Sequence, residues 1–256
     1  MILRANQSLT LWSFFRRCGN EERRFLKKTS IDFQNINDRK VIVCGLRSSY
    51  SKRPRSKCVL SKESIQVIHA LKLAKSKSSE KLHQILNSSL TRLLNRDLLD
   101  VLAELQRQNE LHLSLKVFNF IREEPEYDKM LSLYADMILL LGRNKMIEEA
   151  EELFSEVVER GLKPDTRMCT EMIGAYLQVG MIDKAMEIYG SMKENALGCS
   201  PDKLTFTILI RNLEKNGQEE LAATLKQECV DYVESPDKFL KEVDQIHGRK
   251  RYLNLA

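Results

Sequence analysis

The stretch MIEEAEELFSEVVERGLKPD, residues 146–165, joins a helical pattern to an abrupt stop. Its apolar residues recur at helical spacing, and Gly161 followed by Pro164 ends the helix, because proline has no amide hydrogen to donate. The closing Pro-Asp pair returns at 201–202 and 236–237. Three of the five prolines therefore stand in one dipeptide at near-constant spacing, which indicates an internal repeat.

Aligning the chain on these pairs gives units 131–165, 166–202 and 203–237, with a weaker copy at 95–130. Small residues fill one aligned column, where two helices can approach closely: Ser114, Ala150, Ala185 and Ala222. Within a unit, Gly180 or Gly217 separates two apolar helical patterns. Such a hairpin cannot bury its apolar face alone, so neighbouring hairpins stack. We expect an all-α solenoid of antiparallel helix-turn-helix repeats, in which proline ends each second helix and Asp caps the next first helix.

The flanks of the repeats differ in charge from the body. Residues 1–60 carry 14 Lys/Arg and 4 Asp/Glu, a net charge of +10. Because the whole chain has a net charge of +5, residues 61–256 have a net charge of −5. A basic, acid-poor leader predicts a transit peptide over 1–44, with IVCG (42–45) similar to a chloroplast cleavage pattern. Chloroplast import is favoured over mitochondrial import, and the alternative is a basic arm that stays attached and touches nucleic acid.

Three further segments complete the predicted organisation. A basic linker is expected at 45–60, N-terminal helices at 61–94, and a C-terminal capping helix or tail at 238–256. No apolar run approaches the roughly 18 residues of a membrane span, so we expect no membrane partner.

Cysteine and histidine spacing argues against catalysis and metal binding. The six cysteines lie far apart without a C-x-x-C motif, which favours free thiols in a reducing compartment. The four histidines have no nucleophile or metal-ligand spacing around them. We therefore expect neither an enzyme nor a cofactor.

The Pro-Asp units resemble pentatricopeptide repeats, paired helices of about 35 residues that end in G-x-x-P-D. Tetratricopeptide repeats have a similar period, but their W…L-G…Y signature is missing here. The short chain and its basic leader look more specifically like the plant thylakoid-assembly-eight-type proteins, plastid factors that promote splicing of group II introns. The C-terminus lacks the H-x-E and C-x-x-C ligands of the deaminase domain that ends many editing factors.

The resemblance implies that each repeat reads one base of single-stranded RNA with its fifth and last residues. The resulting pairs are Leu99 with Met130, Ala135 with Asp165, Thr170 with Asp202, and Thr207 with Asp237. In the family's code, Thr with Asp favours guanine. The second residue of a unit flanks the base, which assigns stacking or phosphate contacts to Arg167 and Leu204. Each Asp has an alternative role as an N-cap, and each Thr as an ordinary exposed helix residue.

Two threonine repeats are too few to select one transcript, because a good contact discriminates by only about 1–3 kcal/mol. We therefore expect self-association on RNA or dependence on other splicing factors. The alternative function is a helical-repeat scaffold that binds proteins without RNA contact.

Overall fold

The computed structural model describes residues 60–124, 127 and 130–253, and side chains up to residue 244. Over these residues it is all-α without strands, which confirms the predicted fold class. The first helices of the predicted repeats are α4 (Asn95–Arg107), α6 (Leu131–Arg143), α8 (Thr166–Val179) and α10 (Lys203–Lys215). Their partners are α5 (Leu111–Arg122), α7 (Ile147–Glu159), α9 (Ile182–Lys193) and α11 (Glu219–Glu228). The predicted transit peptide and nearly all of the basic linker lie outside the described residues.

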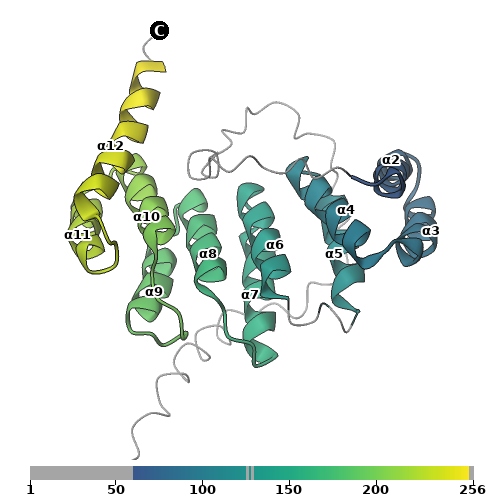
Figure 1. Ribbon diagram of the computed structural model, residues 1–256, viewed down its shortest axis with the longest axis horizontal. Helices are drawn as coiled ribbons and strands as arrows, with labels where there is room; N and C mark the ends of the chain where they lie inside the picture. Colours follow the sequence, from purple (N-terminus) through teal and green to yellow (C-terminus); the bar gives the residue numbers. More distant parts are fainter. Residues whose placement is uncertain (1–59, 125–126, 128–129, 254–256) are drawn as a thin grey trace, which may run out of the picture. The chain divides into compact units, whose positions relative to one another are not determined.

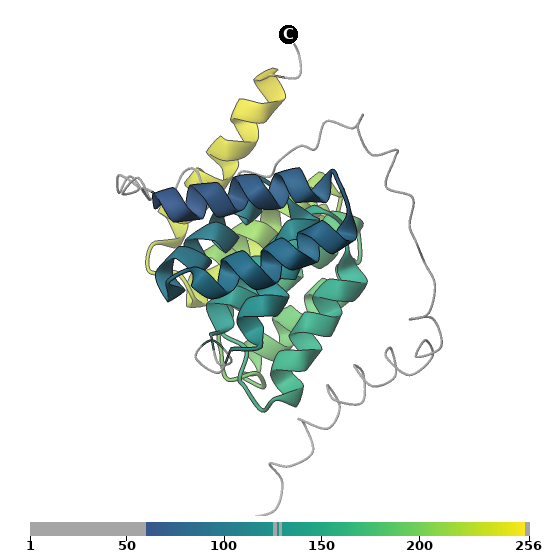
Figure 2. The same cartoon turned by 90° about the vertical axis from the view of Figure 1, so that its right-hand side faces the viewer.

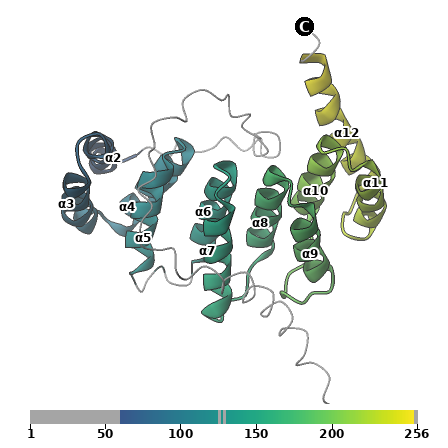
Figure 3. The same ribbon diagram turned by 180° about the vertical axis from the view of Figure 1, so that it is seen from behind.

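Among the described residues, two helices precede the aligned repeats and one follows them. They are α2 (Lys62–Lys75), α3 (Ser79–Ser89) and α12 (Pro236–Leu253), with short 3₁₀ turns η1 (Leu90–Arg92) and η2 (Cys229–Asp231). In Figure 1 the hairpins follow one another in chain order, from α2 and α3 in dark blue to α11 and α12 in yellow. Figure 3 shows the same order from behind.

The first helices of successive repeats pack side by side. α6 contacts α8, α8 contacts α10, and α10 contacts α12, while each first helix also packs on its own second helix. The small-residue column is buried as expected, at Ser114, Ala150, Ala185 and Ala222. Phe118 of α5 and Tyr134 of α6 meet edge to face, with ring centroids 5.3 Å apart, and both rings are fully buried. Apolar burial across successive hairpins is therefore what stacks them.

α6 and α8 approach each other closely at Gly142. A Cβ added to Gly142 would lie 2.7 Å from Cβ and 3.0 Å from Cα of Ala175. Ordinary carbon contacts lie near 3.5–4.0 Å. A residue without a side chain is thus required where these two backbones meet.

The turn between the two helices of each aligned repeat contains one left-handed residue. Gly180 (φ 82°) and Gly217 (φ 76°) occupy it in the last two repeats, as the sequence predicts. Asn109 (φ 57°) and Lys145 (φ 62°) occupy the same position in the two earlier repeats. A long side chain at Lys145 therefore sits in a conformation that glycine adopts at lower cost.

The Pro-Asp pairs do not all act alike. Asp165 and Asp202 stand at the N-caps of α8 and α10, as expected. The prolines follow the second helices at a distance, because α7 already ends at Glu159 and Gly161 (φ 74°) turns the chain. At the third pair the expectation is wrong: Pro236 begins α12, and Asp237 lies in its first turn. Proline is well suited to the first helical position, where its missing N–H costs nothing.

The α2–α3 hairpin continues the stack in a register the sequence alignment did not include. α2 packs on α4, and Figure 2 shows this end of the row in front, in dark blue. Lys75 Nζ lies 2.8 Å from Glu110 Oε2, and the amides of Asn109 and Asn144 bond each other at 2.9 Å. Both contacts join residues 35 positions apart. Within the described part of the chain, the periodic stack therefore includes the α2–α3 hairpin.

Candidate nucleic-acid interface

The predicted base-reading residues all lie around the first turns of the first helices. Asp165 Oδ1 accepts a hydrogen bond from the backbone N–H of Met168 at 2.7 Å, and Asp202 Oδ1 accepts one from Thr205 at 2.8 Å. Both carboxylates are nevertheless exposed. The capping role is therefore real, and it leaves these side chains within reach of a ligand.

Thr170 does not face an open groove. Its side chain is only 1% exposed, and its Oγ1 lies 2.7 Å from the carbonyl of Thr166 and 2.8 Å from Oγ1 of Thr205. Thr205 Oγ1 in turn lies 2.9 Å from Asp202 Oδ1. The expectation of an accessible hydroxyl is wrong here, because the neighbouring repeat covers Thr170 and engages its oxygen.

A short hydroxyl chain therefore connects the predicted pair Thr170 and Asp202 through Thr205. Each hydroxyl has one hydrogen, so Thr170 donates either to Thr166 or to Thr205, and Thr205 donates either to Asp202 or to Thr170. Thr205 was missed by the sequence analysis. The spacing of Asp202 and Thr205, an N-cap with a hydroxyl three residues on, is the capping-box signal that points to it.

Ala135 is also closed off. It is fully buried in α6, so the expectation that it stands at a base-reading position open to RNA is corrected in the same way. Its methyl group belongs to the interior between helices. The exposed member of that predicted pair is Asp165.

The last repeat offers the most accessible set. Thr207 is half-buried and donates its hydroxyl to the carbonyl of Lys203 at 2.7 Å. Leu204, in the same first turn, is 37% exposed, and Asp237 is exposed at the start of α12. Lys203 joins the two helices, since its Nζ lies 3.0 Å from Glu242 Oε2 and 5.4 Å from the centroid of the Phe239 ring. The structure thus brings polar and apolar groups together at the α10–α12 junction.

Two cations in these first turns, Arg167 and Lys203, already have carboxylate partners. Arg167 forms an ion pair with Asp136 of the preceding repeat. Sequence reasoning missed Asp136, which pairs with a residue 31 positions away and carries no local signal. An RNA phosphate at Arg167 has to compete with this carboxylate, so the net attraction is smaller than that of a free guanidinium.

Ion pairs also join the second helices of neighbouring repeats. Arg122 Nη1 lies 2.7 Å from Glu156 Oε2, Lys184 Nζ 2.5 Å from Glu151 Oε1, and Lys193 Nζ 2.9 Å from Glu228 Oε2. Hydrogen bonding from Tyr189 and from Lys193 lowers the pKa of Glu228, against a smaller opposing effect of burial. These cations of the second helices are therefore paired with carboxylates, so the second helices are poorly suited to bind phosphates.

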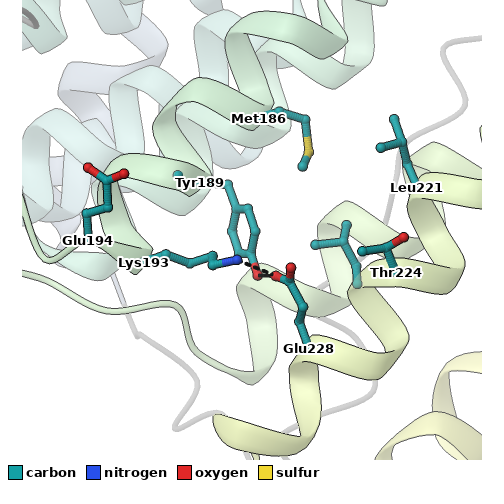
Figure 4. A pocket seen from close by; sticks show the side chains of 9 residues that line it. Met186, Tyr189, Lys193, Glu194, Leu221, Thr224 and Glu228 are labelled. Carbon is teal, nitrogen blue, oxygen red and sulfur yellow. Dashed lines mark hydrogen bonds and ion pairs between the residues drawn. The ribbon is translucent and has the colours of Figure 1, made fainter.

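A hollow of about 270 Å³ lies between α9 and α11 (Figure 4). Met186 and Leu221 line it together with Tyr189, whose hydroxyl donates to Glu228 Oε2 at 2.6 Å. Lys193 closes one side through its ion pair with Glu228. The hollow is lined by α9 and α11, the second helices of their repeats, and its charged residues Lys193 and Glu228 are paired with each other.

The described residues contain neither a cluster of metal-ligand side chains nor a membrane-spanning helix. No group of three or more His, Cys, Asp or Glu side chains is placed to hold a metal ion there. Among the described helices, none has the length and apolar character to cross a membrane.

Comparison with known proteins gives consistent matches. The protein-family model for the PPR repeat matches residues 132–162, and the one for the PPR repeat family matches residues 165–215. Pentatricopeptide repeat-containing protein At1g62350 of Arabidopsis thaliana is 31% identical over 157 residues, which cover 60% of this chain and 77% of that protein. Protein THYLAKOID ASSEMBLY 8, chloroplastic, of the same plant is 31% identical over 186 residues, which cover 71% of this chain and 82% of that protein.

Longer relatives match in part. Pentatricopeptide repeat-containing protein At3g06430, chloroplastic, of Arabidopsis thaliana is 27% identical over 144 residues, and the match spans only 29% of its length. Among solved structures, the crystal structure of THA8 in complex with Zm4 RNA matches at a TM-score of 0.48 and 25% identity, covering 67% of this chain and 95% of that one.

Proposed function

This chain belongs to the pentatricopeptide repeat family, and from that premise we propose that it binds single-stranded RNA along the first turns of its first helices. One observation carries the proposal beyond family membership. Leu204 and Thr207 of α10 are at least partly exposed, and Asp237 is exposed at the start of α12, a helix that packs on α10. A hydroxyl and a carboxylate are suited to the hydrogen-bonding edge of a base, and a leucine to its face.

The proposal assigns different roles to the eight predicted residues. Direct contact is proposed for those with accessible side chains, namely Asp165, Arg167, Asp202, Leu204, Thr207 and Asp237. Thr170 and Ala135 shape the helix interface beneath them, because both are buried. In the 166–202 repeat, the exposed Asp202 carboxylate therefore makes the proposed contact with the edge of the base.

The finer role we propose is assistance in group II intron splicing in the chloroplast. The support is the similarity to a protein named THYLAKOID ASSEMBLY 8, chloroplastic, together with the basic leader. A fluorescent fusion of residues 1–60 should enter plastids, and accumulation in mitochondria would contradict this part. Because so few base contacts are accessible, selection of one intron requires a second copy of the chain or a splicing factor.

Binding is tested with the full chain and short single-stranded RNAs on nitrocellulose filters at graded salt. RNA binding is expected to weaken steeply as salt rises, because phosphate contacts release counterions. The slope of log affinity against log salt concentration measures the number of phosphate contacts. We expect this number to be small, because Arg167 and Lys203 are already paired with carboxylates. Absence of retained RNA at low salt would refute the proposal and favour the protein-scaffold alternative.

Base preference is tested at Thr207. Thr207→Asn should move the preference from guanine toward uracil, with a change of roughly 1–3 kcal/mol at one base. Thr224→Asn is the matched control, because Thr224 also donates its hydroxyl one turn back, to Glu220 at 3.0 Å, but lies in the second helix α11. An equal shift in both variants, or none in either, would count against base reading by Thr207.

A further inference from the structure

Two thiols from different parts of the 166–202 repeat meet beside the predicted base site. Cys169 lies in the first turn of α8, next to Thr170, and Cys199 lies in the loop between α9 and α10. Their sulfur atoms are 3.7 Å apart. At this separation they are already in van der Waals contact, whereas a disulfide bond measures about 2.05 Å.

The loop is held in place for this contact. Thr166 Oγ1 at the start of α8 donates to the carbonyl of Ser200 at 3.1 Å, directly after Cys199. Asn195 (φ 53°) and Gly198 (φ 76°) turn the chain before it. The hydrogen bond from Thr166 to Ser200 after Cys199, together with the turn at Asn195 and Gly198 before it, therefore holds the two sulfurs together.

We propose that Cys169 and Cys199 form a redox-reactive dithiol site, which a disulfide oxidant of the glutathione or thioredoxin class converts into an intramolecular disulfide. The Cys199 thiolate attacks the oxidant RSSR, forming a mixed disulfide and releasing one RS⁻. Cys169 then gives up its proton and attacks the Cys199 sulfur, releasing the second RS⁻. The two protein thiols are oxidised, and the oxidant is reduced to two RSH.

The order of attack follows from exposure and charge. Cys199 is half-buried and reachable, whereas Cys169 is fully buried. The hydrogen bond between them lowers the pKa of Cys199, and the same bond together with burial raises the pKa of Cys169. The outer thiol is thus the nucleophile, and the inner one resolves the mixed disulfide.

Closure of this bond would fasten the α8 first turn to the loop that leads to Asp202. Thr170 is covered by Thr205, so a base that contacts the exposed Asp202 carboxylate can also reach Thr170 only if the α8–α10 contact loosens. The disulfide opposes that loosening. This consequence rests on the proposed RNA binding, whereas formation of the bond does not.

The test treats the reduced full chain with graded ratios of oxidised to reduced glutathione, followed by alkylation and peptide mapping. Mapping identifies a Cys169–Cys199 cross-link independently of Cys18, Cys44 and Cys58, which lie outside the described residues. Wild type and Cys229→Ala should both form it, since Cys229 is buried elsewhere and contacts the carbonyl of Lys226. Cys169→Ala should retain glutathione on Cys199, because the resolving thiol is gone.

Two further readouts separate the steps. Because the bond closes a loop of about 30 residues, the oxidised chain should melt about 5–10 °C higher than the reduced chain. Its affinity for single-stranded RNA should fall about fivefold or more. Stable glutathione on Cys199 in wild type, or no cross-link at any ratio, would overturn the dithiol site. Equal affinity in both states would overturn the closure step, and if neither state binds RNA, only the proposed function fails.

Discussion

Replacement of Gly142 by alanine should destabilise the protein, although alanine is the better helix former. The added Cβ would lie 2.7 Å from Ala175 Cβ and 3.0 Å from its Cα, about 1 Å closer than ordinary contact. Both atoms belong to fixed positions on α8, so no rotamer change relieves the clash. The helices must separate, and overpacking of this kind costs roughly 1–3 kcal/mol.

The helix propensity gained by removing glycine is at most about 1 kcal/mol, and it is smaller here because Gly142 lies in the last turn of α6. The net loss should be about 1–2 kcal/mol. For a folded part of this size, the melting temperature should fall by about 2–8 °C.

Gly190→Ala is the matched control. Gly190 lies inside α9, and nothing stands within 4 Å of the position its Cβ would take. This variant should gain roughly 0.5–1 kcal/mol. Denaturant unfolding followed by far-ultraviolet circular dichroism measures both. A Gly142→Ala protein as stable as wild type, or more stable, would refute the close α6–α8 approach.

Three further outcomes are expected. Lys145→Gly should stabilise the chain by about 0.5–1 kcal/mol in denaturant unfolding, because φ 62° is strained for lysine; unchanged stability would mean that the turn is relaxed. Ser114→Ala should raise the melting temperature slightly, since Ser114 Oγ is buried without a hydrogen-bond partner among the described residues; a lower value would reveal a partner. Glu228 has a lowered folded pKa, so its stabilisation is present above its ordinary value of 4.5 and lost as pH falls through the folded value. Tyr189→Phe should therefore flatten the loss of stability as the pH falls below 4.5, measured by acid titration of the unfolding free energy, and an unchanged slope would remove Tyr189 as the cause.

Repeat features with local signals were predictable from the sequence. The left-handed turns at Gly180 and Gly217 and the caps at Asp165 and Asp202 depend on residues within one or two helical turns. The same reasoning failed at Pro236, because a Pro-Asp pair can equally begin a helix, with proline at its first position. Which use occurs depends on the segment before it, and here the 3₁₀ turn η2 and the residues after it intervene.

The sequence alone determined the helical hairpins and their stacking, because a period of about 35 residues carries apolar faces that only a neighbouring copy can cover. It did not determine which polar side chains remain open. Thr170 and Thr207 hold the same place in their repeats, yet Thr205 covers the first, while the second stays half-buried. Whether a side chain is exposed depends on contacts between repeats. Sequence spacing gives the position of a residue within its repeat, but it does not show whether a side chain of the neighbouring repeat covers it. The meeting of Cys169 with Cys199 depends in the same way on how the loop folds back onto α8.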